Sequence, residues 1–143
     1  VMNINVKTVF FFSQAVAKQF IKQNSGGKII NIASMLSFQG GIRVPSYTAS
    51  KSGVMGITKL LANEWAKHNI NVNAIAPGYL RTAFSASALE DENIASTLLK
   101  RIPLRRFGEP EDIVPLVIYL ASSASDYMTG ETILIDGGHL CHL

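Results

Sequence analysis

The sequence predicts an α/β domain with a parallel sheet and helices on both of its faces. Three short apolar runs alternate along the chain with longer segments of helical periodicity. Right-handed β-α-β connections produce this order. The chain has 143 residues, of which 48% are hydrophobic and 16% charged. That length and composition suit one folded domain with a substantial core, and they argue against disorder.

The N-terminal part of the chain predicts a helix followed by a strand. Apolar residues recur at spacings of three and four between residues 5 and 22, which indicates a helix, and the Ser-Gly-Gly run at 25–27 ends it. The run at 28–33 is apolar and rich in isoleucine, with Asn31 as the exception. Such a run is typical of a strand that is buried on both faces of a parallel sheet. A loop rich in serine and glycine follows.

The middle of the chain repeats this alternation. A helix is expected over residues 45–67, because apolar side chains form one stripe along it. The run at 71–76 predicts a second strand, which Pro77 and Gly78 end. Residues 79–106 are mixed in composition and predict short helices.

The C-terminal part predicts one more helix and one more strand. The helix is expected at 111–121, with Pro110 suited to its first turn. The strand is expected at 132–135, and the chain turns out of it at 136–138. Three strands make a thin sheet whose first strand has an unpaired edge. We therefore expect the chain to be the C-terminal part of a larger α/β domain whose N-terminal strands are absent.

Composition and charge argue against several functional classes. The net charge of +3 is mild, and the basic pairs at 100–101 and 105–106 lack interleaved aromatic residues, so no nucleic-acid partner is expected. No apolar stretch is long enough to span a bilayer, so no membrane partner is expected. The single cysteine, Cys141, excludes an intrachain disulfide and fits a reducing compartment such as the cytoplasm. His139, Cys141 and His142 form a predicted terminal tail without a second ligand pair, so no metal site is expected.

Three features of the sequence point to chemistry at one edge of the sheet. Tyr47 and Lys51 form a Tyr-x-x-x-Lys pair, whose members share one face of a helix. An isolated pair of this kind is usually a surface aromatic beside a solvated lysine. A phenol has a pKa of about 10, and a neighbouring ammonium favours its anion, so the tyrosine could exchange a proton with an alcohol or a carbonyl. Ser34 follows the first strand and Pro77-Gly78 follows the second, at the carboxyl ends where ligands bind in open α/β sheets.

The chain resembles the short-chain dehydrogenase/reductase family over essentially its whole length. The matching strings are Met-Asn-Ile-Asn-Val at 2–6, Ile-Asn-Ile-Ala-Ser at 30–34, Tyr-Thr-Ala-Ser-Lys at 47–51, Asn-Val-Asn-Ala-Ile-Ala-Pro-Gly at 71–78 and Ile-Asp-Gly-Gly at 135–138. The resemblance implies a doubly wound, Rossmann-like fold in which residues 1–143 are the C-terminal catalytic and substrate-binding portion of a single domain. It also implies an NAD(P)-dependent oxidoreductase that transfers a hydride between nicotinamide and a secondary alcohol or ketone.

The resemblance implies roles for individual residues. Tyr47 would be the catalytic acid/base, and Ser34 would hydrogen-bond the substrate oxygen. Lys51 would lower the pKa of Tyr47 and hold the nicotinamide ribose, and Asn5 would anchor a water of the proton relay. The implied cofactor-binding residues are Tyr47, Lys51, Pro77, Gly78, Leu80 and Thr82.

The resemblance leaves part of the cofactor site without a match. The family has a Gly-rich turn for the pyrophosphate and an acidic residue that reads the adenosine ribose, and neither has a counterpart in this sequence. We therefore expect the chain alone to be inactive. The family branch suggests NAD as the cofactor, with NADP left open.

The segment from residue 33 to residue 51 looks most like the sugar-acid branch of the family. This implies a keto-sugar acid or hydroxy acid substrate of the 2-dehydro-3-deoxy-D-gluconate or 2-deoxy-D-gluconate type. A guanidinium suits the carboxylate of such a substrate. Arg43 is therefore expected to bind the substrate together with Ser34 and Tyr47, and Arg81 is a second candidate. The ordinary alternative for each arginine is a solvated surface residue.

Two alternatives stay open from the sequence. The first is a 3-oxoacyl or other ketone reductase of the same family. The second is a non-catalytic oligomerisation fragment, because amphipathic helices equivalent to those predicted here commonly form tetramers in this family. A homotetramer is the oligomer that the resemblance implies.

Overall fold

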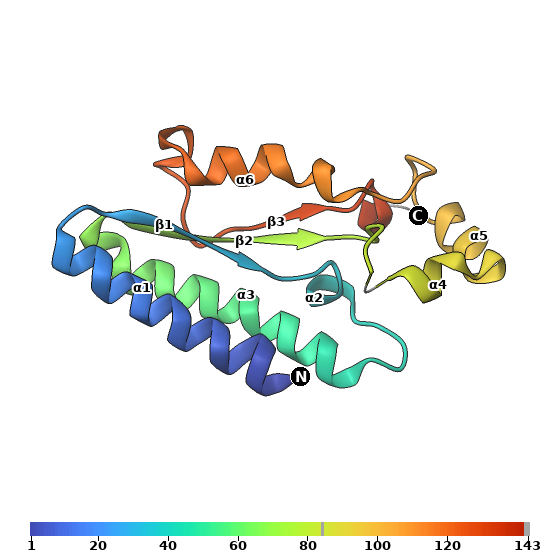
Figure 1. Ribbon diagram of the computed structural model, residues 1–143, viewed down its shortest axis with the longest axis horizontal. Coiled ribbons are helices and arrows are strands. Elements are labelled where there is room, and N and C mark those ends of the chain that lie inside the picture. Colours follow the sequence, from blue (N-terminus) through green and yellow to red (C-terminus); the bar gives the residue numbers. More distant parts are fainter. Residues whose placement is uncertain (84, 142–143) are drawn as a thin grey trace.

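The computed structural model describes residues 1–83 and 85–141, and it confirms the predicted α/β architecture. Three parallel strands form one sheet in the order β1 (Gly27–Ile32), β2 (Ile70–Pro77), β3 (Thr132–Ile135). The helices α1 (Val9–Gln23) and α3 (Pro45–Trp65) lie on one face of this sheet, and α6 (Val114–Ala121) covers the other (Figure 1).

The parallel pairing brings the carboxyl ends of the strands to one edge. β1 pairs with β2 from Gly27 opposite Ile70 to Ile32 opposite Ile75, and β2 also pairs with β3 near its own carboxyl end. The segments that follow the three strands therefore emerge on the same side of the molecule. The predicted site residues after β1 and β2 are among them.

β2 is the central strand and the centre of the core. Ile70, Val72, Ala74, Ile75 and Ala76 are each at most 1% exposed. Helices cover both faces of this strand, which explains why its sequence is almost continuously apolar rather than alternating.

The buried asparagines of the strands have hydrogen-bond partners. The Nδ2 of Asn31 in β1 donates to Thr58 Oγ1 of α3 at 3.0 Å, and its Oδ1 accepts from Ser13 Oγ of α1 at 3.5 Å. The Nδ2 of Asn73 in β2 donates to the carbonyl of Met128 at 2.8 Å. Because a buried amide without partners is costly, the two bonds of Asn31 fix how α1 and α3 sit on the sheet.

The N-terminal helix differs from the predicted one in its first turns. Residues Asn3–Thr8 form a π-helix (η1), and the regular helix α1 begins only at Val9. α1 ends at Gln23, where Asn24 adopts a left-handed conformation with φ of 52°. The periodicity of apolar residues does not distinguish a π-turn from an α-turn over so few residues.

The helix predicted at 111–121 is present and ends at the predicted residue, but it begins later than predicted. Residues Pro110–Asp112 form a 3₁₀ turn (η3), and α6 begins at Val114. Pro115 lies in the first turn of α6. Proline has no N–H to donate, so it is tolerated in the first turn of a helix but not in its interior.

The loop segments contain several short elements. The Ser- and Gly-rich loop after β1 includes a short helix that was not predicted. The mixed segment after β2 contains short helices, as predicted. These elements are α2 (Leu36–Gln39), α4 (Ala86–Glu90) and α5 (Glu92–Lys100), together with the 3₁₀ turns η2 (Ala66–His68), η4 (Ser123–Ser125) and η5 (His139–Cys141).

The prediction of a terminal tail is wrong for His139. This side chain is 4% exposed, and its ring packs edge-on against the ring of Tyr79 at a centroid distance of 5.6 Å. Cys141 is an exposed free thiol, and His142 lies outside the described residues. Within residues 1–83 and 85–141, no three His, Cys, Asp or Glu side chains are grouped so that they could hold a metal ion.

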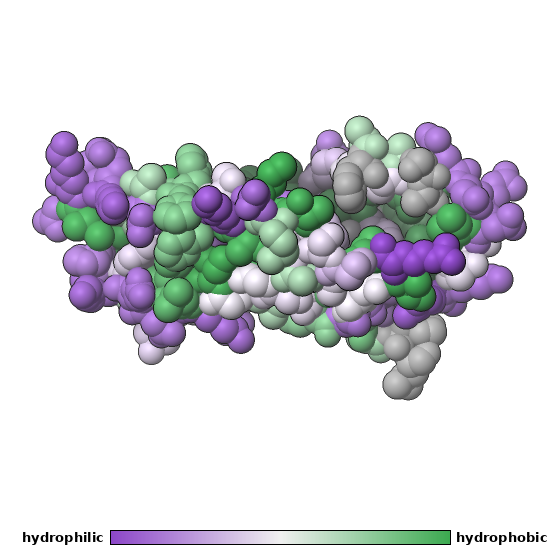
Figure 2. Space-filling view, turned by 90° about the horizontal axis from the view of Figure 1, so that it is seen from below, coloured by the Kyte–Doolittle hydropathy of each residue, from purple (hydrophilic) through white to green (hydrophobic). Residues whose placement is uncertain are grey.

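Apolar side chains also reach the surface of the helices. The face seen in Figure 2 includes hydrophobic areas between more hydrophilic ends of the molecule. Phe11 and Phe12 of α1 are 54% and 70% exposed, and Leu60 of α3 is 47% exposed.

None of the described helices combines the length and the apolar character that crossing a membrane requires.

Candidate active site

The start of α3 places Tyr47 and Lys51 next to each other. The helix begins at Pro45, so Tyr47 lies in its first turn and Lys51 lies one turn later on the same face. Lys51 Nζ is 5.8 Å from the centroid of the Tyr47 ring, within the range of a cation–π contact. The predicted pair is therefore adjacent in space.

Lys51 also ties α3 to the end of β1. Its Nζ donates to the carbonyl of Ile32 at 2.8 Å, two residues before Ser34. Burial lowers the pKa of the Lys51 ammonium from its ordinary value of 10.5, because desolvation disfavours the charged form. A partly desolvated cation thus stands where the first strand ends.

Ser34 is buried directly after β1. Its Oγ accepts from the backbone N–H of Leu36 at 3.2 Å, and its own N–H donates to Ser37 Oγ at 3.3 Å. Among the described residues, no acceptor is bonded to the Ser34 hydroxyl proton, so this hydroxyl can cap the loop and still donate to a ligand. The neighbouring Met35 N–H donates to the carbonyl of Pro77 at 3.0 Å, which joins this loop to the end of β2.

Asn5 reaches the same helix from η1. Its Nδ2 donates to Ser50 Oγ at 3.1 Å, and Ser50 Oγ donates to the carbonyl of Tyr47 at 2.7 Å. Ser50 is completely buried. It was not among the predicted site residues, although it lies within the string at 47–51, because its spacing from Tyr47 carries no chemical signal of its own.

The turn after β2 is packed closely against the end of β3. The N–H of Gly78 donates to the carbonyl of Ile135 at 2.7 Å. A Cβ at position 78 would lie 2.7 Å from the Cα of Asp136, closer than real Cβ contacts come. Glycine is therefore required here by the approach of β3, whatever the turn binds.

Leu80 and Thr82 lie in the segment after this turn, which hydrogen bonds also hold in place. Leu80 forms a parallel bridge with Gly108, and the N–H of Arg81 donates to the carbonyl of Gly108 at 2.8 Å. The N–H of Thr82 donates to Ser85 Oγ at 3.1 Å. These bonds hold the predicted cofactor-binding residues in fixed positions.

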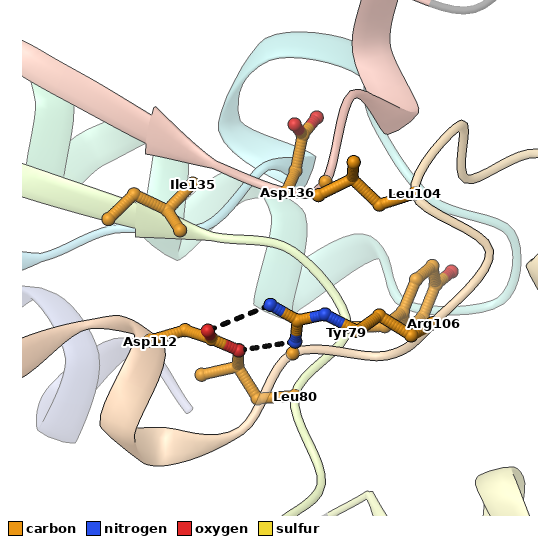
Figure 3. A pocket seen from close by; sticks show the side chains of 9 residues that line it. Tyr79, Leu80, Leu104, Arg106, Asp112, Ile135 and Asp136 are labelled. Carbon is orange, nitrogen blue, oxygen red and sulfur yellow. Dashed lines mark hydrogen bonds and ion pairs between the residues drawn. The ribbon is translucent and has the colours of Figure 1, made fainter.

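A cavity of about 240 Å³ lies beside the turn (Figure 3). Leu80 lines it, but Asn5, Ser34, Tyr47 and Lys51 do not. Its polar wall includes Asp136 and an ion pair in which Arg106 donates to both oxygens of Asp112, at 2.6 and 2.9 Å (Figure 3). The hydrogen bond from Arg106 and a second from the Glu109 N–H lower the pKa of Asp112 from 3.8 to about 2. Because Tyr47 and Lys51 do not line the cavity, it is distinct from the Tyr–Lys site.

A more open hollow of about 360 Å³ lies next to Thr82. It faces the segment that contains α4. Its lining residues are Arg81, Thr82, Ala83, Ala86, Leu89 and Glu90. Thr82, a predicted cofactor-binding residue, and Arg81, the second candidate for substrate binding, both lie in its wall.

The two candidate arginines differ in their surroundings. Arg43 is exposed in the loop between α2 and α3, in a left-handed conformation with φ of 62°, and makes no hydrogen bond or ion pair to any described residue. Arg81 is engaged on both sides, since its Nε is 3.4 Å from Glu109 Oε1 and its guanidinium lies 5.3 Å from the Phe107 ring centroid. Arg43 is thus the arginine whose guanidinium is available.

Known proteins are similar to this chain in sequence. A family model described as enoyl-(acyl carrier protein) reductase matches residues 1–139. A 2-dehydro-3-deoxy-D-gluconate 5-dehydrogenase of Escherichia coli (strain K12) is 66% identical over 140 residues, which are 98% of this chain and 55% of that protein. The chain therefore spans about half the length of this curated relative.

Solved structures agree with the fold. A gluconate 5-dehydrogenase from Burkholderia cenocepacia J2315, in complex with NADP and tartrate, is 36% identical with a TM-score of 0.97, and the match covers 100% of this chain and 56% of that chain. A 4-hydroxyisoleucine dehydrogenase complexed with NADH is 34% identical with a TM-score of 0.97, and the match covers 100% and 59%. With a family model matched over nearly all of its residues, the chain belongs to the short-chain dehydrogenase/reductase family.

Proposed function

We propose that this chain carries the acid/base and substrate-binding part of an NAD(P)-dependent oxidoreductase. The substrate would be a secondary alcohol or ketone of a sugar acid of the 2-dehydro-3-deoxy-D-gluconate or 2-deoxy-D-gluconate type. The observation that carries the proposal is the contact of Lys51 with both the Tyr47 ring and the carbonyl of Ile32, close to Ser34 at the end of β1. The 66% identity to a named sugar-acid dehydrogenase supports the substrate class.

Four residues would divide the proton chemistry among them. Tyr47 would give its hydroxyl proton to the substrate oxygen during reduction and take one during oxidation. Ser34 would donate its hydroxyl proton to the same oxygen as a hydrogen bond, and Lys51 would favour the tyrosinate by its charge. Asn5 would hold a water through which the proton is replaced. When bound, the nicotinamide would supply or accept the hydride at the substrate carbon.

The residues at the sheet edge fit the nicotinamide ribose. Lys51 offers an ammonium 5.8 Å from the centroid of the Tyr47 ring, and Tyr47 offers its hydroxyl; both are donors that sugar hydroxyls accept. Leu80 and Thr82, together with the turn at Pro77 and Gly78, would line the nicotinamide itself. These positions do not distinguish NAD from NADP, so either nicotinamide is part of the proposal.

Arg43 would bind the substrate carboxylate. Its guanidinium is exposed, whereas that of Arg81 is held by Glu109 and stacked on Phe107. A residue held at positive φ in a loop beside the site is the kind of local strain that clusters at functional positions.

The assembly and location of the enzyme belong to the same proposal. A homotetramer would use the apolar side chains that α1 and α3 expose, such as Phe11, Phe12 and Leu60. A cytoplasmic location would suit the single free thiol of Cys141.

The test is a set of assays on the protein expressed from its complete gene. We expect reduction of 2-dehydro-3-deoxy-D-gluconate with NADH or NADPH, and we expect Tyr47→Phe to lower kcat by about 10²-fold or more. Tyr127→Phe, at a fully exposed tyrosine, is the matched control and should keep wild-type kcat. Arg43→Met should raise KM for the keto-sugar acid far more than for a neutral ketone.

Each outcome of these assays tests a different part of the proposed function. A folded Tyr47→Phe protein with wild-type kcat would refute the acid/base assignment. Equal KM effects of Arg43→Met on both substrates would remove Arg43 from the site. Faster turnover of a 3-oxoacyl thioester than of any sugar acid would replace the substrate class and keep the reaction type.

A further inference from the structure

Ser50 is buried between two of the residues that the proposed function uses. It is 0% exposed, and its hydroxyl contacts both η1 and the first turn of α3. Its Oγ donates to the carbonyl of Tyr47 at 2.7 Å and accepts from Asn5 Nδ2 at 3.1 Å. A single buried oxygen thus links the peptide of Tyr47 to the side chain of Asn5.

The hydrogen count of this link fixes the orientation of the Asn5 amide. A serine hydroxyl has one proton, and a carbonyl oxygen can only accept, so the proton of Ser50 points at Tyr47. Toward Asn5 the Ser50 oxygen is then only an acceptor. The NH₂ group of Asn5 must therefore face Ser50, and its Oδ1 must face away from it.

The packing of the two elements explains why the contact forms. Asn5 lies in the π-helix η1, and single π-turns occur frequently at functional sites. One turn beyond Ser50, a Cβ at Gly53 would lie 3.6 Å from Val6 of η1. This distance is an ordinary van der Waals contact, so η1 packs directly against α3 beside Ser50, where the Asn5 amide reaches its hydroxyl.

We infer that Ser50 is a positioning residue, which rests on the proposed function of Tyr47 and Asn5. Its hydroxyl holds the Asn5 amide in one orientation and holds the Tyr47-bearing turn of α3 in register with η1. Ser50 does not touch the reacting atoms. It acts by keeping the side chain of Asn5 and the acid/base Tyr47 at a fixed separation. Small errors in the position of such groups lower the catalytic rate strongly.

The kinetic test uses the protein expressed from its complete gene and four variants. Ser50→Ala should lower kcat about tenfold with KM changed less than about twofold, and it should move the ionisation seen in the kcat/KM pH profile by about half a pH unit or more. Ser52→Ala, an exposed serine two residues further along α3, is the matched control and should change none of these. Asn5→Ala and the double variant Asn5→Ala/Ser50→Ala complete a cycle in which the double loss should be no larger than about that of Asn5→Ala.

A second readout does not need activity. The side-chain NH₂ signals of Asn5, followed by NMR, should shift and exchange faster with solvent in Ser50→Ala and stay unchanged in Ser52→Ala. Should Ser50→Ala not fold, Ser50→Cys keeps the size of the side chain with a weaker donor and is used in its place.

The outcomes separate the inference from the proposed function. Wild-type kinetics in Ser50→Ala, or losses that multiply in the double variant, would overturn the positioning role. Unchanged Asn5 signals in Ser50→Ala would overturn it as well. An inactive wild-type protein whose Asn5 signals still depend on Ser50 would support the contact and sink the proposed oxidoreductase function instead.

Discussion

At Gly78 the absence of a side chain decides how two strands end. The turn after β2 meets the segment after β3 so closely that a Cβ at position 78 would stand 2.7 Å from both the Cα and the Cβ of Asp136. The backbone N–H of Gly78 donates a hydrogen bond to the carbonyl of Ile135 at 2.7 Å. Since the clash involves backbone, the protein cannot relieve it by rotating a side chain.

We therefore expect Gly78→Ala to destabilise the fold by about 1–3 kcal/mol, as overpacking does. Gly56→Ala is the matched control, because a Cβ at this exposed position of α3 meets nothing within 4 Å. Alanine is the better helix former, so the control should be neutral or more stable by up to about 1 kcal/mol. Urea unfolding of both variants measures the difference, and equal stabilities would contradict the assigned clash.

At the scale of elements, α5 shows how a short helix is held at both ends. Asp91 Oδ1 accepts from the N–H groups of Asn93 and Ile94 at 2.9 and 3.1 Å, which caps the N-terminus. Arg105, at φ of 54°, donates from Nη1 to the carbonyl of Lys100 at 2.9 Å at the other end. Such caps matter most in short helices, where much of the backbone lacks an intrahelical partner.

Asp91→Ala should cost about 1 kcal/mol of stability by removing the N-cap. Asp91→Asn keeps a capping oxygen and should stay close to the wild type. The free energy of unfolding in urea gives the size of the effect, and hydrogen exchange of the α5 amides gives its location. Faster exchange spread evenly over the sheet, with the α5 amides unaffected, would show that Asp91 does not stabilise the N-terminus of α5.

At the scale of the whole molecule, the charge of Asp112 contributes to the way stability changes with pH in acid. The ion pair with Arg106 joins the segment before η3 to the start of the helical region on the α6 face. Its bonds lower the folded-state pKa of Asp112 to about 2, below its ordinary value of 3.8. Between these two values the unfolded chain binds more protons than the folded one.

The sign of the pH effect follows from this difference. The contribution of Asp112 is fully present above about pH 4 and is lost as the pH falls toward 2. Asp112→Asn should flatten the loss of unfolding free energy over that range, as measured by urea unfolding at several pH values. Glu111→Gln removes the same charge one residue earlier and should keep the wild-type slope. A wild-type slope in Asp112→Asn would contradict the assignment.

Much of the architecture could be predicted because it depends on local pattern. The isoleucine-rich run at 28–33 and the run at 71–76 mark strands buried on both faces, and both strands lie within one or two residues of the predicted bounds. Tyr47 and Lys51 could be paired because a helix places residues four apart on one face. Their chemical roles stay a prediction.

The order of strands and helices, the parallel sheet and the Tyr–Lys pair were determined by the sequence itself, because continuous apolar runs and the helical period of 3.6 residues are local properties of the chain. The tertiary structure decided the rest. Asn5 donates a hydrogen bond to Ser50, 45 positions along the chain. His139 is buried against the Tyr79 ring, and Arg81 forms an ion pair with Glu109. Each of these contacts depends on which faces of distant segments approach one another and how closely, and no spacing within a single segment encodes that.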